Sequence, residues 1–237
     1  MNFDHNRSVE CRASRPRLGV LMLQTRFPRL PGDVGHPDTW PFAVRYATVD
    51  RATVARVVAA EPDPDLREPL LAAARELIAA GVEALTTSCG FLVRWQAELQ
   101  QQLPLPFYSS ALMLVPELQA ALPPGRRVGV LSYNARRLTP AHLAAAGAPA
   151  STPVAGLEEK DELYRVIRDD RPVLDPAAAA AGVLCAARRL ARQAPDLGAV
   201  VLECTNLPPY APALRTVLGR PVFGLPDLIR RRLRGPC

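Results

Sequence analysis

The amino-acid sequence predicts an α/β fold of two pseudosymmetric lobes, each a small parallel sheet flanked by helices, with the active site in the cleft between them. Three observations support this prediction: short apolar runs without alternation, alanine- and leucine-rich helical stretches between them, and a second occurrence of both patterns later in the chain. Apolar runs that alternate with helical stretches of about 10 to 15 residues are typical of βαβ units. The 237 residues, 49% of them hydrophobic, suffice for one large domain or two small lobes.

The first predicted element is a strand over residues 18–23, with the continuous apolar sequence LGVLML. A run without polar alternation suits a strand that is buried on both faces. A loop rich in proline and glycine follows over residues 26–41 and contains Arg26, Arg29, His36 and Trp40. Such loops commonly carry function, and an arginine in one can hold a carboxylate through two parallel hydrogen bonds.

The next elements lead to a cysteine. A helix over residues 70–80 ends at Gly81, and a strand over 82–87 is followed by Cys89. A helical stretch then leads to Pro106 and Phe107. A short helix over 112–122 lies among prolines and marks the boundary between the two halves.

The second half repeats this order. Residues 127–131 (RVGVL) match residues 17–21 (RLGVL) in type, and a helix over 178–193 leads into a strand over 199–202 and then to Cys204. From the glycine of the first strand to the cysteine is 70 residues in the first half (19 to 89) and 75 in the second (129 to 204). The repeat predicts that Cys89 and Cys204 occupy equivalent positions in similar lobes.

Four segments follow from these elements. We expect a disordered tail over 1–16, a first lobe over 17–112, a second lobe over 113–223, and a C-terminal helix over 224–237 that packs back on the first lobe. The arginines at 230, 231, 232 and 234 suit the negative end of that helix. The tail lacks the apolar segment of a secretory signal, which favours a cytoplasmic protein.

Composition excludes several functional classes. The net charge of +6 comes without the aromatic and glycine pattern of an RNA-binding sheet, so nucleic acid is not expected as a partner. No apolar run approaches the roughly 18 residues that span a membrane. Five widely spaced cysteines indicate free thiols, and neither they nor the three histidines form a metal-ligand cluster. We therefore expect no metal and no cofactor, and a homo-oligomer is compatible with the sequence.

The two cysteines predict a chemistry. Ligands of parallel sheets bind beyond the carboxyl ends of the strands, where Cys89 and Cys204 both lie, and a following helix N-terminus would lower the pKa of each thiol. Facing lobes would place one sulfur on each side of a substrate, so that one removes a proton and the other returns it. Either cysteine alone is better explained as a buried core residue, but their equivalence in the repeat favours catalysis.

Polar residues that follow the same strands are the candidates for substrate binding. They are Gln24, Thr25, Arg26, Thr87, Ser88, Gly90, Tyr133, Asn134, Thr205 and Asn206. Backbone amides and hydroxyls at these strand ends can hold a substrate carboxylate and the charge that develops on it.

At these residues the chain resembles the aspartate/glutamate racemase superfamily, which includes glutamate, aspartate and hydantoin racemases, maleate isomerase and arylmalonate decarboxylase. The similarity begins at Arg17 and is carried by residues 19–25 (GVLMLQT), 86–90 (TTSCG) and 203–208 (ECTNLP). The last segment resembles the family's Gly-Cys-Thr-His and Glu-Cys-Thr-Asn type motifs. The resemblance implies two α/β lobes and a pair of cysteines acting as opposed acid/base groups without pyridoxal phosphate.

Departures from the family pattern bear on the substrate. Gly90 and Phe91 follow the first cysteine where the amino-acid racemases have Asn-Thr, and Gln24-Thr25 replaces the Asp-Ser of glutamate racemases. Glutamate is therefore not expected as the substrate, and the second cysteine argues against the decarboxylase branch. The resulting hypothesis is an isomerase: a cofactor-independent racemase or epimerase of a small carboxylate-bearing substrate. A hydantoin racemase, a maleate-type cis–trans isomerase and a non-catalytic two-lobed binding protein remain the alternatives.

Overall fold

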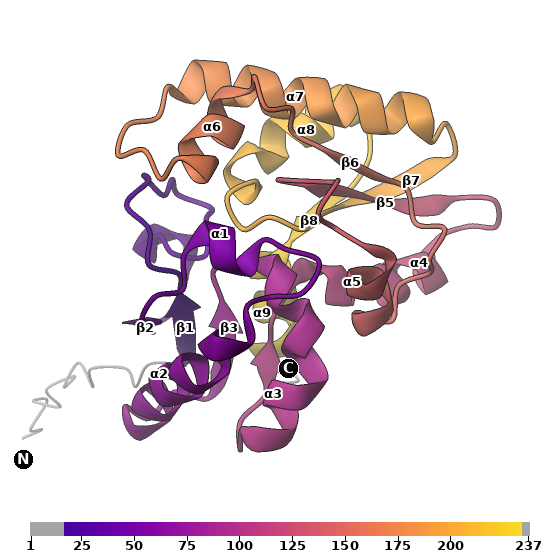
Figure 1. Cartoon of the computed structure of the whole chain (residues 1–237). Coiled ribbons are helices and arrows are strands. Elements are labelled where there is room, and N and C mark those ends of the chain that lie inside the picture. The colour runs from indigo at the N-terminus through magenta and orange to yellow at the C-terminus, as the bar shows by residue number, and fades with distance from the viewer. Residues whose placement is uncertain (1–16, 234–237) are drawn as a thin grey trace, which may run out of the picture.

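The computed structural model describes residues 17–233, which form two stacked lobes (Figure 1). Each lobe contains one four-stranded parallel sheet, and the carboxyl ends of the strands face the other lobe. The strands of the first lobe are β1 (Leu18–Met22), β2 (Val44–Thr48), β3 (Ala84–Thr87) and β4 (Phe107–Tyr108). The strands of the second lobe are β5 (Arg127–Ser132), β6 (Val154–Gly156), β7 (Leu197–Leu202) and β8 (Val222–Gly224).

The two sheets have the same topology. Their strand orders are β2-β1-β3-β4 and β6-β5-β7-β8, and every pair is parallel. The central strands β3 and β7 are buried along their whole length, as the unbroken apolar sequence of β7 predicts, and β3 also buries Thr86 and Thr87. The predicted fold class, two pseudosymmetric α/β lobes, is therefore confirmed.

The first strand of each lobe contains a glycine, and the structural reason is the same in both lobes. A Cβ at Gly19 would lie 2.8 Å from Leu85 Cδ2 on the neighbouring strand and 3.0 Å from Leu77 Cδ1 on a helix. One at Gly129 would lie 2.5 Å from Leu197 Cδ1 on the neighbouring strand and 3.2 Å from Leu190 Cδ2 on a helix. Glycine lets a leucine-bearing helix approach the strand closely. The repeated RLGVL and RVGVL sequences thus record the same packing of helix on sheet in both lobes.

Helices cover the outer faces of the sheets, with α2 and α3 below the first sheet and α7 and α8 above the second in Figure 1. The helices are α1 (Val54–Val57), α2 (Arg67–Ala79), α3 (Gln96–Gln102), α4 (Val115–Ala121), α5 (Pro140–Ala145), α6 (Glu162–Arg168), α7 (Pro176–Gln193), α8 (Ala211–Leu218) and α9 (Leu225–Leu233). Short 3-10 turns occupy Pro37–Thr39, Pro64–Leu66, Gly90–Trp95, Ala111–Leu114 and Pro208–Tyr210. The helices at 70–80 and 178–193 are present as α2 and α7.

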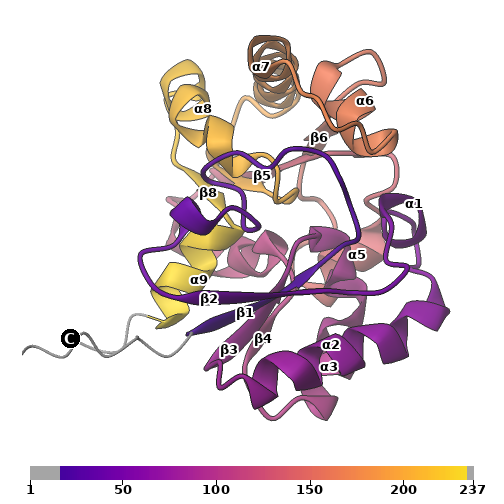
Figure 2. The same cartoon turned by 90° about the vertical axis from the view of Figure 1, so that its left-hand side faces the viewer.

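The C-terminal part of the described chain returns to the first lobe. Leu225, Leu228, Ile229 and Leu233 of α9 are buried in the core cluster that contains β1 and β3. Figure 2 shows α9 beside the edge of the first sheet, below β8. The helix contacts the turn at Ala111–Leu114, which also contacts β7. This arrangement ties the two lobes together away from the cleft.

Several of the sequence-based expectations concern residues near the two ends of the chain. The tail over 1–16, Arg234 and the cysteines at 11 and 237 lie outside the described residues. Arg231 and Arg232 pair with Glu117, and Arg230 donates to the carbonyl of Thr39. Within residues 17–233, no helix has the length and apolarity needed to cross a bilayer.

Candidate active site

A small pocket lies between the lobes at the carboxyl ends of the central strands. Both predicted cysteines line it, together with residues from the loops after β1, β3, β5 and β7. The lining residues are Leu23, Phe27, Arg29, Val54, Val58, Ser88, Cys89, Gly90, Phe91, Tyr133, Ile167, Glu203, Cys204, Thr205 and Asn206. The pseudosymmetry of the fold therefore brings the two equivalent cysteines to one cavity.

Cys89 is held by the end of β3. The Thr87 hydroxyl accepts from the Cys89 backbone N–H at 3.2 Å and donates to the Ser109 carbonyl at 3.0 Å. Ser88 Oγ accepts from the backbone N–H of Leu23 at 2.8 Å, which fixes this turn against β1. Cys89 directly precedes the 3-10 turn at Gly90–Trp95. Its neighbours in the chain, Thr87 and Ser88 before it and Gly90 after it, are buried and fix its position.

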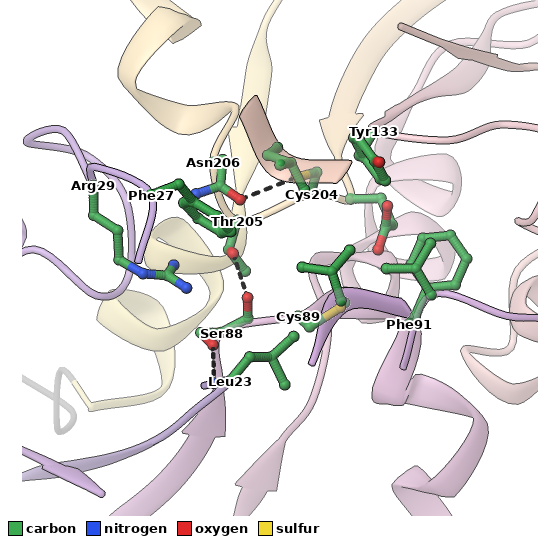
Figure 3. Close-up of a pocket in the computed structure, with 15 residues that line it drawn as sticks. Leu23, Phe27, Arg29, Ser88, Cys89, Phe91, Tyr133, Cys204, Thr205 and Asn206 are labelled. Carbon is green, nitrogen blue, oxygen red and sulfur yellow. Dashed lines mark hydrogen bonds between the residues drawn. The ribbon is translucent and has the colours of Figure 1, made fainter. Parts of the chain in front are cut away.

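Cys204 is held by the end of β7 in the other lobe. Its Sγ lies 3.6 Å from Asn206 Oδ1 and donates to it. The neighbouring Thr205 hydroxyl donates to the Ser88 carbonyl at 2.7 Å, across the interface between the lobes. Figure 3 shows these two contacts, with Cys89 and Cys204 both facing the interior of the pocket.

The expected lowering of the thiol pKa values is wrong. Burial, reinforced by the negative charge of Glu203, raises the pKa of Cys89 to about 12 and raises that of Cys204 well above its ordinary value. The physical reason is that neither sulfur caps an α-helix: α3 begins only at Gln96 and α8 only at Ala211. A single backbone N–H at each sulfur, from Phe91 and Asn206, does not offset the desolvation.

Arg29, and not Arg26, is the arginine of the pocket. Arg26 is exposed and pairs with Asp170 at 3.1 Å, whereas the Arg29 side chain is only 10% exposed. Arg29 Nη1 lies 2.9 Å from Oδ1 of Asp33, a fully buried residue that the sequence did not single out. Asn206 Nδ2 donates to the other oxygen of Asp33 at 2.5 Å. A chain of polar contacts thus runs from Cys204 through Asn206 and Asp33 to Arg29.

Five of the ten predicted substrate-binding residues line the pocket: Ser88, Gly90, Tyr133, Thr205 and Asn206. The others do not. Gln24 is exposed and accepts from the Arg51 N–H, and Asn134 donates to the Tyr164 hydroxyl. Thr25 accepts from Arg29, and Thr87 is buried behind the cysteine loop. Strand ends alone do not distinguish side chains that point into the pocket from those that support it.

Glu203 is a pocket residue that the prediction missed, although it belongs to the quoted ECTNLP segment. It is 1% exposed, and its Oε2 accepts from the Ser132 hydroxyl at 2.7 Å. Its Oε1 is buried without a hydrogen-bond partner and lies where a Cβ on Gly90 would collide with it. Gly90 therefore fits beside Glu203 because it lacks a side chain. Burial raises the pKa of Glu203 to about 7.

The pocket has a polar and an aromatic side. In Figure 3 the Arg29 guanidinium lies on the opposite side of Cys89 from the rings of Phe91 and Tyr133. Tyr133 stacks on Tyr164 with ring centroids 4.8 Å apart, and Phe91 packs edge-on against His142 at 4.9 Å. The two thiols lie between the Arg29 guanidinium and the rings of Phe91 and Tyr133, and a third ring, that of Phe27, has its centroid 5.0 Å from the guanidinium. Such an arrangement suits proton removal from a small carboxylate with an apolar or cationic second end.

Metal ligands are not grouped in this site. Among the described residues, no set of three or more histidine, cysteine, aspartate or glutamate side chains could hold a metal ion. The pocket side chains that can exchange protons are the two thiols, Glu203 and Tyr133.

The chain is similar in sequence to proteins named as lyases. No protein-family model matches it. A dimethylsulfoniopropionate lyase from Durusdinium sp. clade D is 29% identical over 213 residues, which cover 87% of this chain and 70% of that protein. Dimethylsulfoniopropionate lyase 5 from Emiliania huxleyi (strain CCMP1516) is 31% identical over 228 residues, covering 90% and 44%. The chain thus spans less than half of the length of one of these relatives and 70% of the other.

Solved structures share the fold at lower identity. A glycine-to-cysteine mutant of arylmalonate decarboxylase superposes with a TM-score of 0.59 and 20% identity, over 93% of this chain and 95% of that one. A glutamate racemase from Bacillus anthracis superposes with a TM-score of 0.55 and 14% identity, over 93% and 82%. These neighbours confirm the resemblance to the aspartate/glutamate racemase superfamily at the level of the fold.

The comparisons correct the expected function. The relatives matched by sequence over most of the chain are named lyases, so the racemase hypothesis is wrong as the leading interpretation. The relatives matched by sequence are enzymes, which supports the coarser expectation of an enzyme but not the isomerase class.

Proposed function

We propose that this chain is a lyase that cleaves dimethylsulfoniopropionate. The observation that carries the proposal is the 29% identity, over 87% of the chain, to a dimethylsulfoniopropionate lyase of which the chain covers 70%. The composition of the pocket is compatible with this substrate, because it combines one arginine, two thiols and aromatic rings.

The reaction is an elimination. A base removes one proton from the carbon next to the carboxylate, the electrons of that C–H bond form a carbon–carbon double bond, and the carbon–sulfur bond breaks with its electron pair on sulfur. The products are dimethyl sulfide, acrylate and the proton held by the base. Only one face of the substrate has to be deprotonated, which distinguishes this reaction from racemisation.

Arg29 is the proposed anchor for the carboxylate. Its side chain is nearly buried, and Asp33 and Thr25 each hold one of its terminal nitrogens, at 2.9 and 3.2 Å. These contacts fix the guanidinium plane while further N–H groups remain to donate to a carboxylate. A cation at this position also stabilises the negative charge that spreads onto the carboxylate as the proton leaves.

One of the two cysteines is the proposed base. Burial raises the pKa of both thiols, so each holds its proton in the empty pocket near neutral pH. A substrate that carries a sulfonium brings positive charge beside the sulfurs and favours the thiolate. A thiolate formed in a dry pocket is a stronger base than one in water, which suits the weak acidity of a carbon next to a carboxylate.

The direct test is product formation by the purified chain. Incubation with dimethylsulfoniopropionate should release dimethyl sulfide into the headspace and equal amounts of acrylate into solution, followed by gas chromatography and proton NMR. Formation of neither product at any substrate concentration, by a chain that circular dichroism shows to be folded, would overturn the proposal.

A further inference from the structure

Glu203 is a buried acid that the elimination as written does not use. Its backbone is fixed by the hydrogen bond from its N–H to the Leu131 carbonyl at 2.9 Å, and its side chain by Ser132. The second carboxyl oxygen, Oε1, is buried and has no partner. A buried carboxylate oxygen without a hydrogen-bond partner destabilises the folded protein. A structural role alone does not account for it.

The position of Glu203 relates it to the substrate pocket. The residue lines the cavity beside Cys204, and its charge acts on both thiols. Gly90, on the facing loop of the other lobe, has no side chain to cover Oε1, and any side chain there would collide with it. Oε1 itself has almost no accessible surface because the Gly90 backbone lies against it, so a ligand meets this oxygen only when the Gly90 loop moves aside.

The charged groups of the pocket indicate the role of the Glu203 carboxylate. Arg29 is the cation of the pocket and is paired with Asp33, so Glu203 has no cationic partner among the lining residues. Phe91, directly after Gly90, and Tyr133, directly after Ser132 at the end of β5, supply aromatic rings. A carboxylate next to aromatic rings is the usual environment for an alkylated cation in a protein.

We propose that Glu203 is a specificity-determining residue, whose Oε1 recognises the positive charge of the substrate while Arg29 holds its carboxylate. The inference rests on the proposed function and refines its substrate class: zwitterions with a sulfonium or quaternary ammonium about two carbons from a carboxylate. The cation satisfies Oε1, and its charge offsets the repulsion that Glu203 exerts on a thiolate at Cys89 or Cys204.

The test separates charge from shape. 4-Methylpentanoate has the carbon skeleton of dimethylsulfoniopropionate with a neutral CH in place of the sulfonium. Binding of both molecules is measured by calorimetry on the Cys89→Ser/Cys204→Ser protein, which cannot turn the sulfonium over by the proposed route. The same measurement is made after adding Glu203→Gln, Glu203→Asp or, as a matched control, Glu159→Gln at an exposed glutamate that pairs with Arg136.

We expect the Cys89→Ser/Cys204→Ser protein to bind the sulfonium at least tenfold more tightly than 4-methylpentanoate. Glu203→Gln should bring this ratio close to one and leave the affinity for 4-methylpentanoate within threefold. Glu203→Asp should retain part of the preference, and Glu159→Gln all of it. An unchanged ratio in Glu203→Gln, an equal loss of both ligands, or no preference at the outset would overturn the inference.

Failure of this inference and failure of the proposed function give different results. If wild-type protein releases dimethyl sulfide but the preference does not depend on Glu203, the lyase proposal stands and the role of Glu203 is refuted. If no dimethyl sulfide is released but Glu203 governs the preference for the cation, the site binds cationic carboxylates and performs another reaction on them.

Discussion

The Thr205 hydroxyl of the second lobe donates a 2.7 Å hydrogen bond to the Ser88 carbonyl of the first. Both residues are buried, and each directly neighbours one of the two cysteines. This contact joins the two cysteine loops, so the spacing of the sulfurs depends on it. The two bonded residues are not equivalent in the repeat, because Ser88 precedes its cysteine and Thr205 follows the other one.

Removal of this contact should weaken both stability and activity. Thr205→Val preserves the shape of the side chain and leaves the buried Ser88 carbonyl without its donor, which should cost about 1 to 3 kcal/mol in the free energy of unfolding. Urea denaturation measures this loss, and the rate of dimethyl sulfide release should fall further than the loss of folded protein explains. Thr216→Val, at an exposed threonine that bonds within α8, is the control. Equal stability of the Thr205 and Thr216 variants would contradict the importance of the contact.

The cysteine variants should differ from one another. Since elimination needs a base on one face, serine at the basic cysteine should lower turnover by about 100-fold or more, whereas serine at the other should cost less. Cys185→Ser changes an exposed thiol and should leave turnover unaffected. Rates of dimethyl sulfide release from Cys89→Ser and Cys204→Ser check this. Full turnover in both variants would rule out thiol chemistry, and equal large losses would indicate that both sulfurs are needed.

Arg29 and Arg26 form a matched pair for testing the carboxylate anchor. Arg29→Lys keeps the charge but loses the planar donor fork, so KM should rise by about tenfold. Arg26→Lys, on the exposed side of the same loop, should leave KM unchanged. Steady-state kinetics of both variants measure the difference. If the two substitutions had the same effect, the assignment of the anchor to Arg29 would be wrong.

His142 should make stability depend on pH. It is fully buried beside Phe91, its Nε2 has no partner, and burial lowers its pKa to about 4 from an ordinary 6.5. Because the folded-state pKa is lowered, the neutral imidazole contributes its full stability above pH 6.5, and this is lost as pH falls toward 4. The loss at pH 4 should be at most about 3 kcal/mol.

His142→Gln isolates this effect because glutamine can still accept from Thr139 N–H in the capping box that begins α5. We expect the variant to lose less unfolding free energy between pH 7 and pH 5 than the wild-type protein, measured by urea titration at both values. A pH dependence identical to that of the wild type would show that other groups dominate acid destabilisation.

Local sequence patterns were sufficient for the architecture. The continuous apolar runs at β1 and β5, the glycine within each, and the alanine- and leucine-rich segments of α2 and α7 each reflect a single requirement, which is burial against a neighbouring layer. Because the same pattern occurs twice at similar spacing, the two-lobed fold and the equivalence of Cys89 and Cys204 could be predicted before any coordinates.

The composition of the pocket depended on contacts that sequence spacing does not encode. Arg26 and Arg29 are three residues apart in one irregular loop, and only folding decides that Asp170 binds the first and Asp33 the second. In the sequence, Glu203 is one residue of the ECTNLP segment and has no assigned role. Only the fold shows that Gly90, 113 residues earlier, lies against its unpaired oxygen. Burial likewise reversed the predicted pKa shift of both thiols, since desolvation depends on everything packed around a group. Short stretches of sequence determine how helices pack on sheets. The protonation state, solvent exposure and hydrogen-bond partners of side chains in a cavity depend on the assembled fold.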